Sequence, residues 1–303
     1  MKKLSNQEFW PMNKIVFFGT GPVAAASLES LLRNFQIEFV ITKARKHHRD
    51  SAPVEDLAVQ HNLPLKFADD KAALDNLINE AGITSRIGVI VDFGVIVSKK
   101  VIDKFPLGIV NSHFSLLPEW RGADPITFAI LSGQPTTGVS LMLIEPTLDT
   151  GKIIAQKPLQ IAPDDTTPTL TGRLVSLSND LLSEYLPPYI DGKITPKPQS
   201  HPENATYSRK LVKADGILNP EQMTATECER KIRAFIEFPR TRLDFLGQET
   251  IITAVQVLEN YAGDDWPDVI KCANNTFLQI TELINPKSGK QMKTADYLRG
   301  LRA

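Results

Sequence analysis

Cysteine is scarce in this sequence, and long apolar runs are missing. Only Cys228 and Cys272 occur among 303 residues, too few for a disulfide framework or a thiolate zinc cage. A reduced, cytoplasmic compartment is therefore expected. No run of about eighteen apolar residues occurs, so the sequence predicts no membrane-spanning helix.

Excess charge is also missing. The formal net charge is −1, so overall charge predicts no nucleic-acid or membrane partner, although a basic patch can lie on a neutral protein. Lys2 and Lys3 are followed by no apolar stretch, so no signal peptide is expected, and residues 1–11 are interpreted as an extension before the first strand. The length and a hydrophobic content of 42% are sufficient for two domains with substantial cores.

Short β-like runs alternate with helical patterns through the first two-thirds of the chain. The apolar run at 14–19 ends in glycine, residues 22–34 follow with helical spacing, and residues 37–42 form the next apolar run. The alternation continues as far as the run at 138–145. It predicts an α/β domain in which helices cover both faces of a parallel sheet.

The sequence pattern changes after a long predicted helix. Residues 165–186 carry leucines on one helical stripe, and the helix is predicted to end at the following pair of prolines. Five prolines in 187–205 indicate a linker between domains. Beyond residue 208, hairpin-like segments and one helix at 224–236 predict a small β-rich domain, with a barrel as the candidate architecture.

A glycine-rich turn follows the first predicted strand. Gly19-Thr-Gly21-Pro-Val-Ala24 matches the phosphate-binding turn of dinucleotide-binding domains. The acidic companion expected at the end of the second strand is missing, because that strand finishes in Thr42. Since any tight strand-to-helix connection favours glycine, dinucleotide binding is the weaker interpretation.

Polar side chains follow two of the later predicted strands. "NSHFSLLPEWRG" begins at Asn111, and "EPTLDTGK" contains Asp149. Alternation puts Asn111 and His113 on one face of an extended chain, and both loops are expected at the carboxyl edge of the sheet, where ligands bind. Asn111 donates without titrating, His113 donates or moves a proton near neutral pH, and Asp149 accepts a proton. With no evident serine or cysteine nucleophile, this set favours direct attack of an amine on a small carbonyl carbon.

Each motif also has a structural explanation. An Asn-x-His after a strand is often a hydrogen-bonded turn, Leu-Asp-Thr-Gly is often a turn or helix cap, and Ser-Leu-Leu-Pro suits core packing. Convergence of the motifs at one edge of the sheet is what favours catalysis.

Taken together, "NSHFSLLPEWRGADPI", "GVSLM" and "LDTGKII" resemble the signature region of the 10-formyltetrahydrofolate-dependent formyltransferases. "KIVFFGTGPVAAASLESLL" resembles the opening of that family, and "ATYSRKLVKADGILNP" with "IRAFIEFP" resembles the start of its second domain, so the resemblance covers most of the chain. It implies a Rossmann-like formyltransferase domain at 12–189, a linker at 190–207, and an OB-like β-barrel domain at 208–303 that contacts tRNA.

The resemblance also implies roles for particular residues. Asn111, His113 and Asp149 would form the catalytic trio, with 10-formyltetrahydrofolate as the co-substrate and no metal. The residues implied for the folate site are Phe93, Gly94, Val95, Ser115, Leu116, Leu117 and Pro118. Arg121 would face a ligand, although a solvated arginine explains it equally well.

The sequence departs from the family pattern around the folate loop. Gly21 stands between Thr20 and Pro22, where the family has proline directly after the threonine, and Asp92, Phe93 and Ser98 replace the family's residues. These differences concern the detail of folate binding rather than the reaction.

The acceptor amine has to be inferred separately. A basic segment after the second predicted strand contains Lys43, Arg45, Lys46 and Arg49. In the branch of the family that acts on methionyl-tRNA, which this sequence resembles most, a loop at this place enters the acceptor end. Initiator methionyl-tRNA is therefore the expected partner, with phosphates contacted by these cations. A solvated basic loop is the structural alternative.

Two alternative functions remain open. One is a sugar-nucleotide formyltransferase, and the other is a 10-formyltetrahydrofolate hydrolase or folate-binding protein. A monomer without membrane contact is expected.

Overall fold

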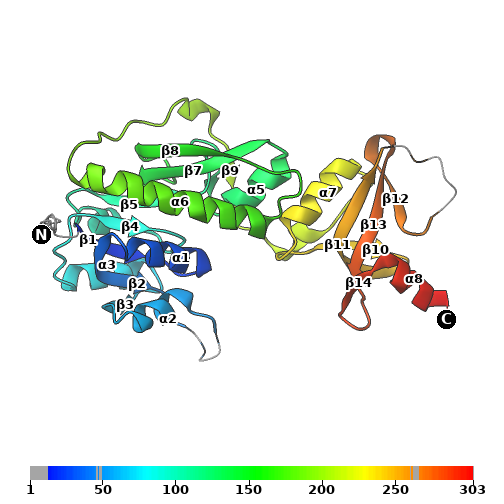
Figure 1. The fold of residues 1–303 in the computed structure, drawn as a ribbon, viewed down its shortest axis with the longest axis horizontal. Helices are drawn as coiled ribbons and strands as arrows, with labels where there is room; N and C mark the ends of the chain where they lie inside the picture. Colours follow the sequence, from blue (N-terminus) through cyan, green and yellow to red (C-terminus); the bar gives the residue numbers. More distant parts are fainter. Residues whose placement is uncertain (1–12, 46, 48–49, 260, 262–265, 303) are drawn as a thin grey trace, which may run out of the picture. The chain divides into compact units, whose positions relative to one another are not determined.

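The computed structural model describes residues 13–45, 47, 50–259, 261 and 266–302 (Figure 1). The predicted extension at 1–11 lies outside these residues. The chain divides into two compact units that alternate along the sequence. The first takes residues up to His113, Val139–Lys157 and Val175–Pro202, and the second takes Phe114–Gly138, Pro158–Leu174 and the residues from Glu203 onward.

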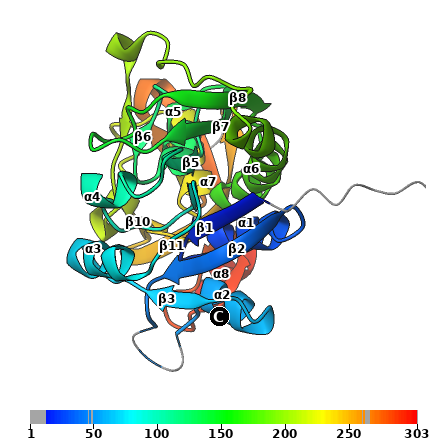
Figure 2. The ribbon, with the colours of Figure 1, turned by 90° about the vertical axis from the view of Figure 1, so that its left-hand side faces the viewer.

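A seven-stranded sheet is the main feature of the first unit. Its strands, in the order β3-β2-β1-β4-β5-β7-β8, are β1 (Asn13–Phe18), β2 (Phe35–Thr42), β3 (Leu65–Phe67), β4 (Gly88–Ile90), β5 (Ile109–His113), β7 (Thr136–Leu143) and β8 (Ile153–Gln160). The helices around it are α1 (Pro22–Leu31), α2 (Pro53–Gln60), α3 (Lys71–Glu80), α4 (Lys99–Ile102) and α6 (Thr167–Ile190). In Figure 2, α3 and α4 lie on one side of the sheet and α1 and α6 on the other. β1 to β5 pair in parallel, which confirms the predicted α/β class.

The sheet is not parallel throughout. β7 runs antiparallel to β5, with Met142 opposite Asn111 and Ser140 opposite His113. The expectation that both polar loops leave from the carboxyl edge of parallel strands was therefore wrong for the second loop, because β7 ends beside Val110. The apolar pattern that predicted β7 reports burial on both faces and contains no information about strand direction.

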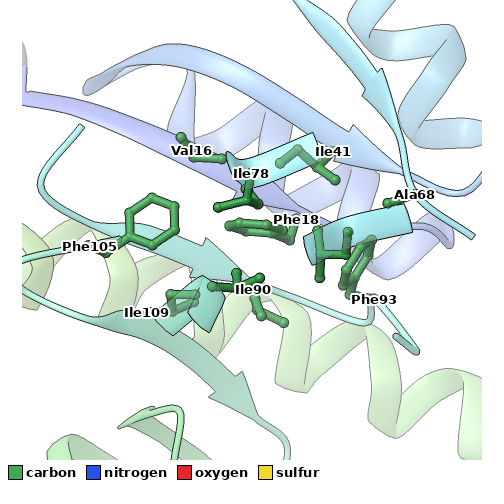
Figure 3. Packing of buried hydrophobic residues seen from close by; sticks show 11 residues of the cluster. Val16, Phe18, Ile41, Ala68, Ile78, Ile90, Phe93, Phe105 and Ile109 are labelled. Atoms are coloured by element: carbon green, nitrogen blue, oxygen red, sulfur yellow. The ribbon is translucent and has the colours of Figure 1, made fainter. Parts of the chain in front are cut away.

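Aromatic residues pack against one face of this sheet (Figure 3). The ring of Phe18 meets the rings of Phe93 and Phe105 edge-on, with centroids 5.7 and 6.0 Å apart. Ile78 of α3 and Ile109 of β5 belong to the same buried cluster. This packing holds the carboxyl ends of β1 and β4 and the first residue of β5, and the loops that follow β4 and β5 contain predicted site residues.

The longest helix continues further than predicted. α6 passes through Pro187 and Pro188 to Ile190 instead of ending before them. Each proline removes one helical hydrogen bond, but both lie in the last turn. The buried Tyr189 holds that turn in place by donating to the Leu107 carbonyl at 2.6 Å. Tertiary packing thus outweighs the local preference of proline.

The second unit contains an antiparallel five-stranded sheet. Its strands are β10 (Thr241–Phe245), β11 (Gln248–Leu258), β12 (Val269–Cys272), β13 (Thr276–Ile284) and β14 (Gln291–Lys293), which pair in the order β10-β11-β13-β12 with β14 beside β13. The remaining elements are β6 (Arg121–Gly122), β9 (Tyr207–Ser208), α5 (Pro125–Ser132), α7 (Ala225–Ala234), α8 (Thr294–Arg302) and short 3-10 turns at Pro202–Asn204, Lys213–Gly216 and Ala273–Asn275. This half-barrel agrees with the predicted OB-like domain. None of the helices described here is both long and apolar enough to cross a membrane.

Candidate active site

His113 and Asp149 lie next to each other within the first unit. The His113 Nδ1 and Asp149 Oδ2 atoms are 3.8 Å apart, and the side chains are only 6% and 12% exposed. This separation is too long for a hydrogen bond, but it places the imidazole and the carboxylate side by side where little water reaches them. Asn111, half-buried, lies two residues earlier on β5 and so faces the same side of the strand as His113.

The loop that presents Asp149 is held close to the end of β7. Asp149 has a left-handed backbone with a φ of 49°, a conformation that aspartate tolerates better than most residues. The Leu143 N–H donates to the Lys152 carbonyl at 2.9 Å. A Cβ added to Gly151 would lie 1.7 Å from the Leu143 carbonyl oxygen, so only glycine allows this approach. The glycine of "LDTG" therefore has a packing role beside the aspartate.

Sequence reasoning missed a residue that supports this loop. The buried Gln199 side chain donates through Nε2 to the carbonyls of Asp149, at 2.7 Å, and Gly151, at 3.1 Å. Gln199 lies in the proline-rich stretch, where nothing in the local pattern distinguished it. Ser140, opposite His113, accepts a hydrogen bond from Gln156 Nε2 at 2.8 Å.

The loop after β4 contains three of the predicted folate residues. Thr20 holds it, since its N–H donates to the Asp92 carbonyl at 3.0 Å and its hydroxyl to the Phe93 carbonyl at 3.1 Å. The Phe93 side chain is buried in the aromatic cluster, whereas Val95 is half-buried and Gly94 has a φ of 65°. Contacts from this loop to a ligand would therefore come from its backbone and from Val95.

Two departures from the family pattern explain each other. A Cβ at Gly21 would lie 2.6 Å from Asp92 Oδ2, so the glycine leaves room for this carboxylate. Gly21 is the N-cap residue of α1 and offers no side-chain cap of its own. The carboxylate thus lies at the positive end of the helix dipole, where a dinucleotide phosphate would otherwise bind. Like-charge repulsion at this point argues against dinucleotide binding.

The loop after His113 belongs to the second unit. Ser115 is buried and donates through Oγ to the Glu119 carbonyl at 2.5 Å, and Leu117 is also buried. Leu116 and Pro118 are half-buried and present the loop's apolar surface. Arg121 is only 6% exposed, which excludes the solvated arginine considered above.

Two of the four cations predicted to contact tRNA have partners within the fold. Lys43 Nζ donates to the Gly94 carbonyl at 3.0 Å, which joins the basic segment to the loop after β4. Arg45 pairs with Glu55 at 3.2 Å and with Asp56 at 2.6 Å. Lys46 and Arg49 lie outside the described residues.

Metal ligation has no obvious place in the described part of the chain. Among those residues, no group of three or more His, Cys, Asp or Glu side chains is arranged to hold an ion. The absence of a metal requirement stays a prediction.

Comparison with known proteins identifies the class. Residues 13–186 match the formyl transferase family, and residues 210–302 match the formyl transferase C-terminal domain. The two matches together cover most of the chain. The chain belongs to the formyltransferase family.

Several relatives are similar over almost their whole length. A methionyl-tRNA formyltransferase of Roseiflexus castenholzii is 33% identical over 306 residues, which cover 95% of this chain and 96% of the relative. A methionyl-tRNA formyltransferase of Herminiimonas arsenicoxydans is 33% identical over 316 residues, covering 95% and 97%. Among solved structures, the N-formyltransferase of Helicobacter canadensis in complex with folinic acid and dTDP-3-aminofucose has a TM-score of 0.71 at 22% identity, covering 89% of this chain and 99% of that one. At that identity, the last similarity shows the fold alone.

Proposed function

We propose that this protein transfers the formyl group of 10-formyltetrahydrofolate to the α-amino group of methionine on initiator methionyl-tRNA, for translation initiation. The observation that carries the proposal is 33% identity to methionyl-tRNA formyltransferases over 95% of the chain. Solved structures of sugar N-formyltransferases share the fold at 18% to 22% identity. A monomer acting in the cytoplasm is the corresponding proposal for its state and location.

Exposed apolar side chains on the loops of the first unit are suited to pack against the ring system of the co-substrate. Ile96, after β4, is 74% exposed, and Leu148, beside Asp149, is 60% exposed. Large apolar side chains left exposed next to polar groups commonly mark a ligand site. Val95 and the backbone of Gly94 lie on the same loop as Ile96. The other proposed folate residues begin two positions after His113 and are Ser115, Leu116, Leu117 and Pro118.

The trio has complementary roles in the proposed reaction. 10-Formyltetrahydrofolate supplies the formyl carbon, and tetrahydrofolate is the product that leaves. Asn111 and His113 donate hydrogen bonds to the formyl oxygen as it becomes negative during attack by the amine. Asp149 accepts the proton that the attacking nitrogen loses. Asp149 then returns a proton to the departing folate nitrogen, so that charge and protons balance, while His113 keeps its hydrogen bond to the formyl oxygen.

The basic segment is proposed to contact the phosphates of the tRNA. Because Lys43 and Arg45 are engaged within the fold, we assign the phosphate contacts principally to Lys46 and Arg49. Lys43 and Arg45 then anchor the segment, the first through Gly94 and the second through acidic residues of α2.

An acceptor assay tests the proposed function. Purified protein and 10-formyltetrahydrofolate are supplied with initiator methionyl-tRNA, elongator methionyl-tRNA or a dTDP-amino sugar, and formylated product and free formate are measured. Formylation of initiator methionyl-tRNA is expected. Preferential formylation of the amino sugar would replace the proposal by a sugar-nucleotide formyltransferase. Release of formate at the same rate without any acceptor would indicate a hydrolase.

Isosteric and small variants test the roles of the trio. Asp149→Asn, His113→Ala and Asn111→Ala are each expected to lower kcat on the order of 10²–10⁴-fold without unfolding the protein. Asp164→Asn serves as the control, since this exposed aspartate has no described partner. Near-normal turnover of one trio variant would contradict the role assigned to that residue.

A further inference from the structure

Residues 187–209 lie outside both family matches, which end at 186 and begin again at 210. Their proline content predicted a linker. In the structure, however, two short parts of this stretch each make several hydrogen bonds to loops that contain proposed site residues. Each part and the loop that it contacts belong to the same compact unit.

The first part, residues 197–199, lies along the loop that contains Asp149. The Ile153 N–H donates to the Lys197 carbonyl at 2.7 Å, and the Lys197 N–H donates to the Ile153 carbonyl at 2.9 Å. Two residues on, the buried Gln199 side chain donates to the carbonyls of Asp149 and Gly151. Four hydrogen bonds therefore connect two residues of the stretch, Lys197 and Gln199, to the loop and to the first residue of β8.

The second part, residues 206–208, lies along the loop that follows His113. The Arg121 N–H donates to the Thr206 carbonyl at 2.9 Å, and the Thr206 N–H donates to the Pro118 carbonyl at 3.3 Å. The Thr206 hydroxyl accepts from the Trp120 N–H at 2.9 Å. The Ser208 hydroxyl accepts from the Asp124 N–H at 3.2 Å. β9 thus pairs in parallel with β6 directly after the proposed folate residues.

Both loops contain backbone that needs external support. Asp149 has a φ of 49° and Trp120 a φ of 52°, left-handed conformations that cost little for glycine, somewhat more for aspartate and most for a bulky residue such as tryptophan. Such conformations persist when surrounding contacts determine them, and they often occur at functional sites. Gln199 donates to the Asp149 carbonyl, and the Thr206 hydroxyl accepts from the Trp120 N–H. Both bonds therefore involve the residues that have the left-handed backbone.

We propose that residues 197–208 are a positioning element of the active site, with a separate task for each part. Gln199 acts through Asp149 and sets the rate of the chemical step. Thr206 acts through the loop at 115–122 and sets the affinity for the folate. The inference rests on the proposed function, because it assigns the two tasks within that reaction.

The two tasks predict effects on different constants, kcat for Gln199 and folate affinity for Thr206. Gln199→Met, which keeps the length of the side chain but removes its donors, is expected to lower kcat on the order of tenfold to a hundredfold, because small misplacements of a reacting group slow chemistry strongly. Its KM for 10-formyltetrahydrofolate should stay within about twofold, and the pH profile of kcat should shift because the carboxylate moves relative to His113.

Thr206→Val is expected to weaken the binding of 5-formyltetrahydrofolate, measured by calorimetry, by about fivefold to tenfold, the usual effect of losing one hydrogen bond. At saturating folate its kcat should stay within about twofold of the wild-type value. Thr206→Ser, which keeps the hydroxyl, should restore affinity.

A matched control lies in the same stretch. Thr195 is exposed, and the described residues provide no hydrogen-bond partner for its hydroxyl, so Thr195→Val should behave as the wild type in every measurement. If Thr206→Val does not fold, Ser208→Ala tests the same loop through the bond to Asp124.

The inference is overturned if the Gln199 and Thr206 variants only lower the melting temperature and leave kcat, folate affinity and pH profile equal to those of Thr195→Val. It is also overturned if both variants change the same constant. A wild-type protein that neither binds folate nor formylates methionyl-tRNA would refute the proposed function instead, so the two failures are distinct.

Discussion

Replacing Gly151 by alanine perturbs the loop of Asp149 without touching the carboxylate itself. The added Cβ would lie 1.7 Å from the carbonyl oxygen of Leu143 and 2.9 Å from its carbonyl carbon. Real Cβ atoms essentially never approach another atom closer than 3.0 Å, and both partners here are backbone, so no side-chain rotation relieves the contact. The loop must therefore move away from β7 by more than about 1 Å.

The expected magnitude follows from that displacement. A shift of about 1 Å in a reacting group is sufficient to lower the rate on the order of 10²-fold. Crowding of a packed site also lowers the free energy of unfolding by about 1–3 kcal/mol. We therefore expect Gly151→Ala to fold at moderate temperature but to lose about 10²-fold in kcat, with the two carbonyl bonds of Gln199 weakened at the same time.

The assay compares initial rates at saturating substrates with thermal unfolding of the same samples. Gly172→Ala is the control, because a Cβ at this position of α6 would meet nothing within 4 Å. Alanine in a helix interior should raise the free energy of unfolding by about 0.5–1 kcal/mol and leave kcat unchanged. A Gly151→Ala variant that keeps more than half of the wild-type kcat would refute the reasoning, since the loop would then position Asp149 without its contact to β7.

Three further outcomes are expected. Joint replacement of Lys46 and Arg49 by alanine should raise KM for tRNA but not for folate. The difference in KM from wild type should shrink as the salt concentration rises, because the lost phosphate contacts are the salt-sensitive ones. A difference that does not depend on salt would contradict this assignment. Ser178→Ala should lower the free energy of unfolding, measured in urea, by about 1–3 kcal/mol. The reason is that the hydroxyls of Ser178 and Ser112 on β5 are hydrogen-bonded at 2.7 Å, and the Ser112 hydroxyl would stay buried without this partner. An unchanged unfolding curve would contradict this expectation. The hydrogen bond from Arg209 lowers the pKa of Asp215 from 3.8 to about 2, so the stabilisation is present above pH 3.8 and is lost as the pH falls towards 2. The difference in melting temperature between wild type and Arg209→Ala should therefore disappear across that window, and a constant difference would argue against the pairing.

The order of elements could be predicted because it depends on local patterns. The apolar run that became β1, the proline at the start of α1 and the leucine stripe of α6 each report burial or turn chemistry over a few neighbouring residues. The capping box of α7, in which Thr224 and Glu227 satisfy each other's backbone N–H groups, is local in the same way.

The composition of the candidate site was also visible in the sequence, because its residues lie in two short motifs that resemble the family signature. Asn111 and His113 alternate along β5, and Asp149 lies in a turn motif after β7. The reasoning that brought them together assumed parallel strands, however, and β7 is antiparallel. The 3.8 Å separation of His113 and Asp149 depends on how the loop between β7 and β8 returns, which no local pattern describes.

Partners distant in sequence were decided by the tertiary structure. Two cations of α7 bond to carbonyls far away in the sequence: Lys231 donates to the Ile217 carbonyl and Arg233 to the Asp165 carbonyl. Gln199 supports Asp149 across 50 positions of the sequence. Periodicity reports only which face of an element is buried. The direction of a strand, the partner of a charge and the support of a strained loop arise when segments far apart in the chain are packed together, and so only the folded protein determines them.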